Sequence, residues 1–214
     1  MSRQRAGLLL MTAGILALAA GIGLGGYNLW DNYRAGIQAD IVLDVIVRRQ
    51  DEAAVPDKAP ETPAESPPDP DRALPVLEVD GRRYIGTVSI PAIDVALPVQ
   101  EDWSLALLKV SPCRYMGSPY RGDFIICAHN YAAHFGRLKN LLPGDEVGFT
   151  DVEGNKFRYA VAELEILDGT AIEGMESGAW DLTLFTCTLG GKTRVTVRCE
   201  LLEALPREKL SFYD

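Results

Sequence analysis

The sequence predicts an all-β domain, a barrel or a sandwich, that follows an N-terminal transmembrane helix and a linker. From about residue 74 onward the apolar residues come in short strand-like runs, and turn-forming residues separate most of these runs. The segment 6–30 carries no charged side chain and is long enough to cross the roughly 30 Å hydrocarbon core of a bilayer as a helix. Between these parts lies a stretch rich in proline and acidic residues.

The N-terminus has the charge pattern of a membrane anchor. Residues 1–5 contain Arg3 and Arg5, and Asp31 follows the apolar segment 6–30. The positive-inside rule therefore predicts a cytoplasmic N-terminus and a single-pass type II protein in the cell membrane, with everything after residue 30 extracellular. The alternative is a cleaved signal peptide, because residues 17–19 form a small-x-small pattern. In both cases the C-terminal part is exported.

Two segments connect the anchor to the domain. In residues 31–50, apolar side chains recur at near-helical spacing, namely Ile37, Ile41, Val45 and Ile46. We therefore expect a juxtamembrane helix that serves as a stalk. Residues 51–73 are rich in Pro, Glu, Asp and Ala and contain almost no large apolar side chain, which predicts an extended, disordered linker.

The folded domain is predicted to span residues 74–214, enough for a single core. Short helices are expected at 104–110 and 134–142. Apolar residues alternate in one phase up to Val161 and in the other phase from Leu164, which predicts a β-bulge near Ala162. The expected strands lie in the runs YIGTVSI, VALPV, DFIICAH, DEVGFT, KFRYAVAELEI, DLTLFTC and RVTVRCELL.

Charge and cysteine content narrow the function classes. A net charge of −9 and a pI near 4.8, with no cluster of Lys and Arg, argue against nucleic acid as a partner. The chain has four cysteines, which in an exported protein admit up to two disulfides, with Cys127 paired to Cys113 or Cys199 as one hypothesis. Their spacing matches no zinc pattern, so we expect neither a metal nor another cofactor.

The residues for nucleophilic catalysis by cysteine are present. Cys187 ends a strand-like run, and a hairpin through the loop TLGGKT would return Arg194 to its level. Arg198 would then lie about 13 Å further along the strand, so Arg194 is the better candidate for stabilising charge. His129 ends another apolar run and is the candidate acid and base, whereas His134 fits a surface or helix-capping role.

Three motifs resemble those of the sortase family, in the family's order. The run DFIICAHNYAAHFGRLKNLLPGDEV is similar to the histidine region of sortases, and LTLFTC matches their Thr-Leu-x-Thr-Cys signature at residues 183–187. KTRVTVRCE resembles the closing strand, with Arg194 at the position of the essential arginine. The resemblance covers about residues 84–202. Ala128 departs from the glycine that usually precedes the histidine, and Cys127 stands where small apolar residues are common.

The resemblance implies a fold and a reaction. Sortases are membrane-anchored cysteine transpeptidases of Gram-positive bacteria with a closed, eight-stranded β-barrel and short helices, so residues 74–214 would form the catalytic domain. Cys187 would attack a C-terminal sorting signal such as Leu-Pro-x-Thr-Gly, His129 would transfer protons, and Arg194 would stabilise the oxyanion. Thr186 and Cys127 would lie at the substrate pocket, although Cys127 also fits the description of a small buried hydrophobic residue. The acceptor would be the amine of lipid II or peptidoglycan, or a pilin lysine in a pilin-polymerising member.

Features outside the motifs indicate a compact, class D-like or unassigned sortase. The linker offers no Asp-Pro-aromatic lid motif, the segment from about 168 to 180 is short, and so is the loop before Arg194. Two other functions remain open at this point. A hydrolytic cysteine protease would use the same thiol with water as acceptor, and a tethered, non-enzymatic binding domain would need none of the three candidate residues.

Overall fold

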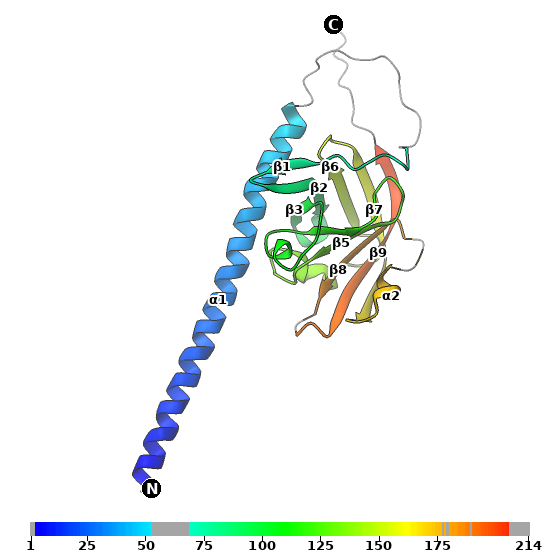
Figure 1. Ribbon diagram of the computed structural model, residues 1–214. Coiled ribbons are helices and arrows are strands. Elements are labelled where there is room, and N and C mark those ends of the chain that lie inside the picture. Colours follow the sequence, from blue (N-terminus) through cyan, green and yellow to red (C-terminus); the bar gives the residue numbers. More distant parts are fainter. Residues whose placement is uncertain (1–2, 53–68, 177, 179, 189, 206–214) are drawn as a thin grey trace.

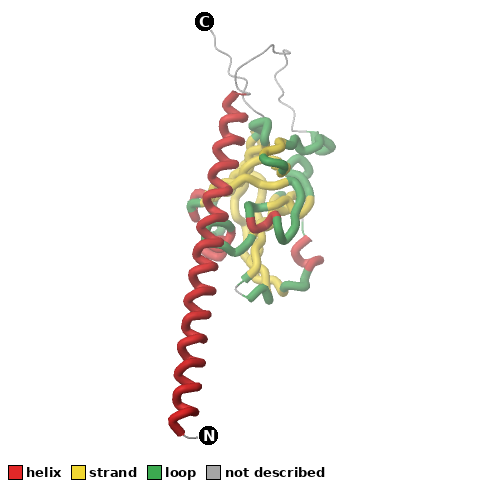
Figure 2. The backbone as a smooth tube through the Cα atoms, turned by 60° about the vertical axis from the view of Figure 1, so that its left-hand side comes forward, coloured by secondary structure: helices red, strands yellow, loops and turns green. Residues whose placement is uncertain are grey.

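The computed structural model describes residues 3–52, 69–176, 178, 180–188 and 190–205 of the chain. The linker predicted for residues 51–73 lies mostly outside these residues. Among the described residues, a long N-terminal helix runs beside one compact β-domain (Figures 1 and 2).

The helix α1 (Arg3–Glu52) is continuous and contains both the predicted membrane segment and the predicted juxtamembrane helix. Its section Leu10–Arg49 includes a window long and apolar enough to cross a membrane, judged by length and composition. The helix does not break at residue 31, because no Pro or Gly interrupts the sequence between Trp30 and Ala35.

The second half of α1 packs against the β-domain and is therefore not a free stalk. Its buried stripe consists of Ala35, Ala39, Val42 and Ile46. The sequence-based choice of face was wrong in part, since Ile37 and Ile41 are 42% and 58% exposed. The physical reason is the small size of the two alanines, whose side chains let the helix backbone approach the sheet closely. Val42 and Ile46 pack with Tyr84 of the neighbouring strand.

The described part of the domain contains nine strands: β1 (Leu77–Val79), β2 (Arg82–Ile90), β3 (Val95–Gln100), β4 (Cys113–Met116), β5 (Phe124–Ala128), β6 (Glu146–Asp151), β7 (Lys156–Asp168), β8 (Leu182–Cys187) and β9 (Thr193–Leu205). Short helices connect some of them: η1 (Pro91–Ile93), η2 (Leu107–Lys109), η3 (Phe135–Asn140) and α2 (Ile172–Glu176). Helices η2 and η3 confirm the two helical insertions predicted from the sequence.

The strands form one sheet whose hydrogen bonding is ring-like. The order is β1-β2-β3-β4-β5-β8-β9-β7-β6, and β6 pairs in addition with β2. Strand β1 adds to the edge of this arrangement, so the sheet has one strand more than the expected eight. Most neighbours are antiparallel, but β3 pairs in parallel with β4, and β5 is parallel to β8 and lies beside it (Figure 1). Parallel neighbours end at the same edge of a sheet, and this arrangement positions the candidate site.

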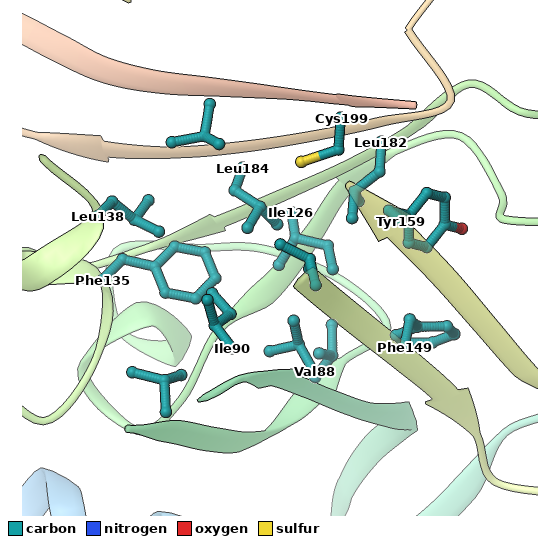
Figure 3. Packing of buried hydrophobic residues seen from close by; sticks show 14 of the residues in the cluster. Val88, Ile90, Ile126, Phe135, Leu138, Phe149, Tyr159, Leu182, Leu184 and Cys199 are labelled. Atoms are coloured by element: carbon teal, nitrogen blue, oxygen red, sulfur yellow. The ribbon is translucent and has the colours of Figure 1, made fainter. Parts of the chain in front are cut away.

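The hydrophobic core fills the space that the ring of strands encloses. Side chains from β2, β5, β6, β8 and β9 meet there with Phe135 and Leu138 of η3 (Figure 3). Cys199 points into this core among apolar side chains (Figure 3). Two aromatic pairs, Phe124 with Phe149 and Tyr120 with Phe157, stack edge to face at centroid separations of 4.9 and 5.2 Å.

The predicted bulge in β7 is confirmed. The ladder between β7 and β9 pairs Val161 with Cys199 and Glu163 with Arg198, so Ala162 is left without a partner in the register. The extra residue shifts the alternation by one, which keeps both Val161 and Leu164 turned toward the core.

Candidate active site

Strands β5 and β8 bring His129 and Cys187 to the same edge of the sheet. Their parallel register pairs Ala128 with Thr186, and His129 and Cys187 are the next residues along each strand. Adjacent strands lie about 5 Å apart, so the two backbones are neighbours at this point. Both side chains belong to the same phase of the alternation, which places them on the outer face of the sheet. Both are partly exposed.

The β8–β9 hairpin returns Arg194 to the level of Cys187, as predicted. The antiparallel register pairs Cys187 directly with Arg194. Thr188 and Thr193 close the hairpin through a 3.0 Å backbone bond, and Gly190 and Gly191 adopt positive φ angles of 87° and 71° in the turn. The Arg194 guanidinium donates to the Gly191 carbonyl at 3.0 Å and remains partly exposed.

A second apolar cluster lies on the outer face of the sheet, next to the edge that carries His129, Cys187 and Arg194. It comprises Cys113, Ile125, Cys127, Met175 and Phe185. Phe185 stacks edge to face on Tyr115 at 5.4 Å, and the ring of Trp103 lies 5.5 Å from that of Tyr115, measured between centroids. The three candidate catalytic residues therefore stand on a packed layer.

The structure places Thr186 and Cys127 beneath the site. Thr186 is buried, and its hydroxyl donates to the Ala128 carbonyl at 2.8 Å, which ties the end of β8 to the end of β5. Cys127 is 3% exposed and packs with Cys113 and Phe185. This surrounding fits a small buried hydrophobic residue in the layer under the candidate catalytic residues.

Arg198 and His134 have other surroundings. Arg198 is buried and donates to Glu165 at 2.6 Å, to the Met175 carbonyl at 2.8 Å and to Thr183 at 3.1 Å. All of these partners are groups of the protein itself, so the Arg198 side chain has a structural role. His134 is fully buried, which contradicts the predicted surface role, and its side chain makes no capping bond at the start of η3.

Burial tunes the titratable groups of the site. It lowers the pKa of His129 below its usual range, and the positive charge of Lys109 lowers it further, while Asp31 acts in the opposite direction. His129 is therefore neutral at neutral pH and able to accept a proton. Burial also lowers the pKa of His134 to about 4, so this second imidazole brings no positive charge to the site at neutral pH.

The four cysteines are free thiols with different surroundings. Burial raises the pKa of Cys113 and Cys199 to about 12 and raises that of Cys127 well above its usual range. Cys187 alone is partly exposed. Thiolates rather than thiols react with alkylating reagents.

We therefore expect iodoacetamide to label Cys187 alone in the native protein at neutral pH, and to label all four cysteines after unfolding. Peptide mapping of the alkylated chain measures this directly. Labelling of Cys113 or Cys127 at a rate close to that of Cys187 would contradict the buried layer. An intact mass that rises on reduction would show a disulfide in place of free thiols.

Within the described ranges, no group of three or more His, Cys, Asp and Glu side chains is arranged to hold a metal ion.

The sequence did not point to two residues of the site. These are Tyr131 and Asp31, which both lie near His129. Tyr131 and Asp31 are separated by 100 positions in the chain. The one sequence signal for Tyr131 is that it follows His129 by two residues.

Comparison with known proteins agrees with this geometry. A family model described as Sortase domain matches residues 88–202. Sortase A of Bacillus anthracis is 27% identical over 118 residues, which cover 51% of this chain and 54% of that protein. The chain thus spans about half the length of this curated relative.

Solved structures show the same fold. Sortase A of Listeria monocytogenes superposes with a TM-score of 0.52 at 22% identity, covering 59% of this chain and 92% of that one. Sortase C1 of Streptococcus agalactiae gives a TM-score of 0.51 at 25% identity, covering 61% and 72%. Since the family model matches more than half of the residues, the chain belongs to the sortase family.

Proposed function

We propose that the protein is a membrane-anchored cysteine transpeptidase. In this proposal it cleaves a C-terminal sorting signal of the Leu-Pro-x-Thr-Gly kind and transfers the acyl protein to an amine of the cell wall. The observation that carries the proposal is the convergence of Cys187, His129 and Arg194 at one edge of the sheet. Membership of the sortase family supports the reaction class.

The first step forms a thioester. The sulfur of Cys187 attacks the carbonyl carbon of the substrate threonine, and its proton passes to the neutral imidazole of His129. The tetrahedral intermediate then collapses with cleavage of the threonine–glycine peptide bond. The imidazolium gives its proton to the departing amine, so His129 returns to its neutral form.

The second step reverses these roles. The incoming amine attacks the thioester carbonyl, and His129 accepts a proton from the amine as the new amide bond forms. The Cys187 thiolate leaves and recovers a proton from the imidazolium. The overall reaction exchanges one amide bond for another and needs neither water nor an oxidant.

Arg194 supplies the fixed positive charge in both steps. A guanidinium remains protonated throughout the accessible pH range and presents several donors in a plane. The partly exposed position of Arg194 opposite Cys187 leaves donors available for the substrate carbonyl oxygen, on which negative charge develops. Thr186 and Cys127 would support the substrate pocket from the buried side.

The wider architecture fits the same proposal. The eight strands of the ring would correspond to the sortase barrel, with β1 as an additional edge strand. The apolar part of α1 would anchor the chain with its N-terminus in the cytoplasm and the catalytic domain outside, because Arg3 and Arg5 precede the uncharged segment. The short segment between β7 and β8 agrees with a compact, class D-like or unassigned member.

The test uses the full-length protein in detergent micelles under reducing conditions. A library of sorting-signal peptides is offered with triglycine, diaminopimelate or a lysine peptide as acceptor, and mass spectrometry follows the products. We expect a ligated product with at least one acceptor, and the acceptor distinguishes cell-wall attachment from pilin polymerisation. Cleavage without ligation would favour a hydrolytic protease. A library without any cleaved or ligated peptide would favour a binding domain.

A further inference from the structure

The helix α1 meets the loop after β5 directly beside His129. Tyr131 donates a hydrogen bond from its hydroxyl to Asp31 Oδ2 at 2.6 Å. The backbone N–H of Ala133 donates to Asn32 Oδ1 at 3.4 Å. Both acceptors belong to the first turn of α1 after the predicted membrane segment, so the loop is tied to the helix at this level.

The hydrophobic packing of α1 holds these acceptors in place. Asp31 lies four residues before Ala35 and therefore continues the stripe formed by Ala35, Ala39, Val42 and Ile46. Ala35, Ala39 and Ile46 are at most 1% exposed. A stripe that is buried over three turns fixes the rotation of the helix, and with it the direction of Asp31.

Tyr131 connects this contact to the catalytic histidine. Its ring lies 4.8 Å from the ring of His129, measured between centroids, at an interplanar angle of 30°. The same ring lies 5.4 Å from that of His134. Tyr131 thus has aromatic neighbours in the loop and a hydrogen bond to the helix, which together restrict its position.

The ring of His129 is only weakly fixed by hydrogen bonds in the part of the chain that the structure describes. Its Nε2 atom is buried and has no hydrogen-bond partner among the described residues. In acid–base catalysis by cysteine enzymes the base is usually oriented by a third group. At this site the third neighbour is the ring of Tyr131.

From these contacts we propose that Tyr131, held by Asp31 of α1, is a positioning residue that orients His129 for proton transfer. The helix that leads out of the membrane is then a component of the active site. This inference rests on the proposed transpeptidase function, since it assigns a role in that reaction.

The charges around His129 agree with such a role. The titratable groups near it are Lys109 of η2, Asp31 of α1, Cys187 of β8, Arg194 of β9, and Tyr131 and His134 of its own loop. Asp31 raises the pKa of His129 and offsets part of the effect of burial and Lys109. Burial and the bond to Asp31 raise the pKa of Tyr131 to about 12, so its hydroxyl stays a donor.

The first test compares kinetics of full-length variants. Tyr131→Ala is expected to lower kcat roughly 10- to 100-fold with little change in KM, because a small misplacement of a catalytic group is enough for such a loss. Tyr131→Phe keeps the ring but loses the bond to Asp31, so it is expected to lose less kcat than Tyr131→Ala and about as much as Asp31→Ala. Asp31→Ala leaves the loop sequence intact and is expected to lower kcat by a smaller factor than Tyr131→Ala does.

The matched control is Tyr33→Ala, since Tyr33 lies on α1 near Asp31 but is 68% exposed. It is expected to behave as the wild type. Unchanged kcat in both Tyr131→Ala and Asp31→Ala would overturn the proposal. So would a rise in KM at constant kcat, because that pattern indicates substrate contact instead of positioning.

A second readout does not depend on turnover. The rate of Cys187 alkylation by iodoacetamide, followed against pH, reports the thiolate that a protonated His129 stabilises. Loss of the Asp31 charge lowers the pKa of His129, so in Asp31→Ala the acceleration that depends on a protonated His129 is expected only at a lower pH than in the wild type, and in Tyr33→Ala at the wild-type pH. An unchanged profile in Asp31→Ala would contradict the contact. Absence of any ligated product from the wild type would instead contradict the proposed function.

Discussion

Replacing Cys187 by alanine is expected to reduce peptide ligation to the uncatalysed background, a loss of at least about 10³-fold. Without the thiol no acyl-enzyme forms, and neither His129 nor Arg194 offers a replacement nucleophile. The fold should remain intact, because Cys187 ends β8 and is partly exposed. Product formation by mass spectrometry and a thermal unfolding curve measure both effects on the same preparation.

Cys127→Ala is the matched control for this prediction. Cys127 is a second cysteine in β5, two residues before His129, but it is buried under the site. Its replacement removes one buried sulfur and is expected to cost about 1 kcal/mol of stability while most of the activity remains. Ligation by the Cys187→Ala protein, or abolished ligation in a folded Cys127→Ala protein, would contradict the assignment of Cys187 as the nucleophile.

Replacing Arg198 by methionine is expected to destabilise the domain by about 2–4 kcal/mol. The guanidinium is 2% exposed and holds Glu165 of β7, Thr183 of β8 and the Met175 carbonyl of α2. Methionine fills much of the same volume but leaves these acceptors without their donor. For a domain of this size we expect the unfolding temperature to fall by roughly 5–15 °C.

The matched control is Arg194→Met, four residues earlier on the same face of β9. Among the described residues its guanidinium donates to carbonyls of its own hairpin, at 3.0 and 3.2 Å, so stability should change by less than about 0.5 kcal/mol. Ligation should fall about 10²–10³-fold through loss of the oxyanion donor. If Arg198→Met were as stable as the wild type while Arg194→Met unfolded, the assignment of the two arginines would be reversed.

Part of the site could be predicted because strand geometry converts sequence spacing into position, whereas the choice of His129 depended mainly on the resemblance to sortases. Alternation along β9 places Arg194 and Arg198 on one face, and the hairpin after Cys187 decides which of them returns to its level. The phase change in β7 predicts the bulge at Ala162, since an extra residue is the simplest way to keep both halves of a strand facing the core. These conclusions depend on local rules alone.

Contacts between segments that are distant in the chain could not be predicted from the sequence. The alanine stripe of α1 is weakly apolar, so hydropathy favoured Ile37 and Ile41, whereas close packing of helix on sheet selects small side chains. His134 is polar and stands beside a helix start, yet the arrival of α1 and Tyr131 buries it. The bond between Asp31 and Tyr131 exists only in the folded chain, and no periodicity within either segment predicts it.

The proposed mechanism is tested most directly by trapping the acyl-enzyme. The full-length protein is incubated with a reactive sorting-signal peptide without an acceptor amine, quenched in acid, and mapped by mass spectrometry of its peptides. We predict an acyl group on Cys187 that triglycine or hydroxylamine removes, and whose formation Arg194→Met slows. Ligation by the wild type without an adduct on Cys187, or with the acyl group on another residue, would contradict the mechanism.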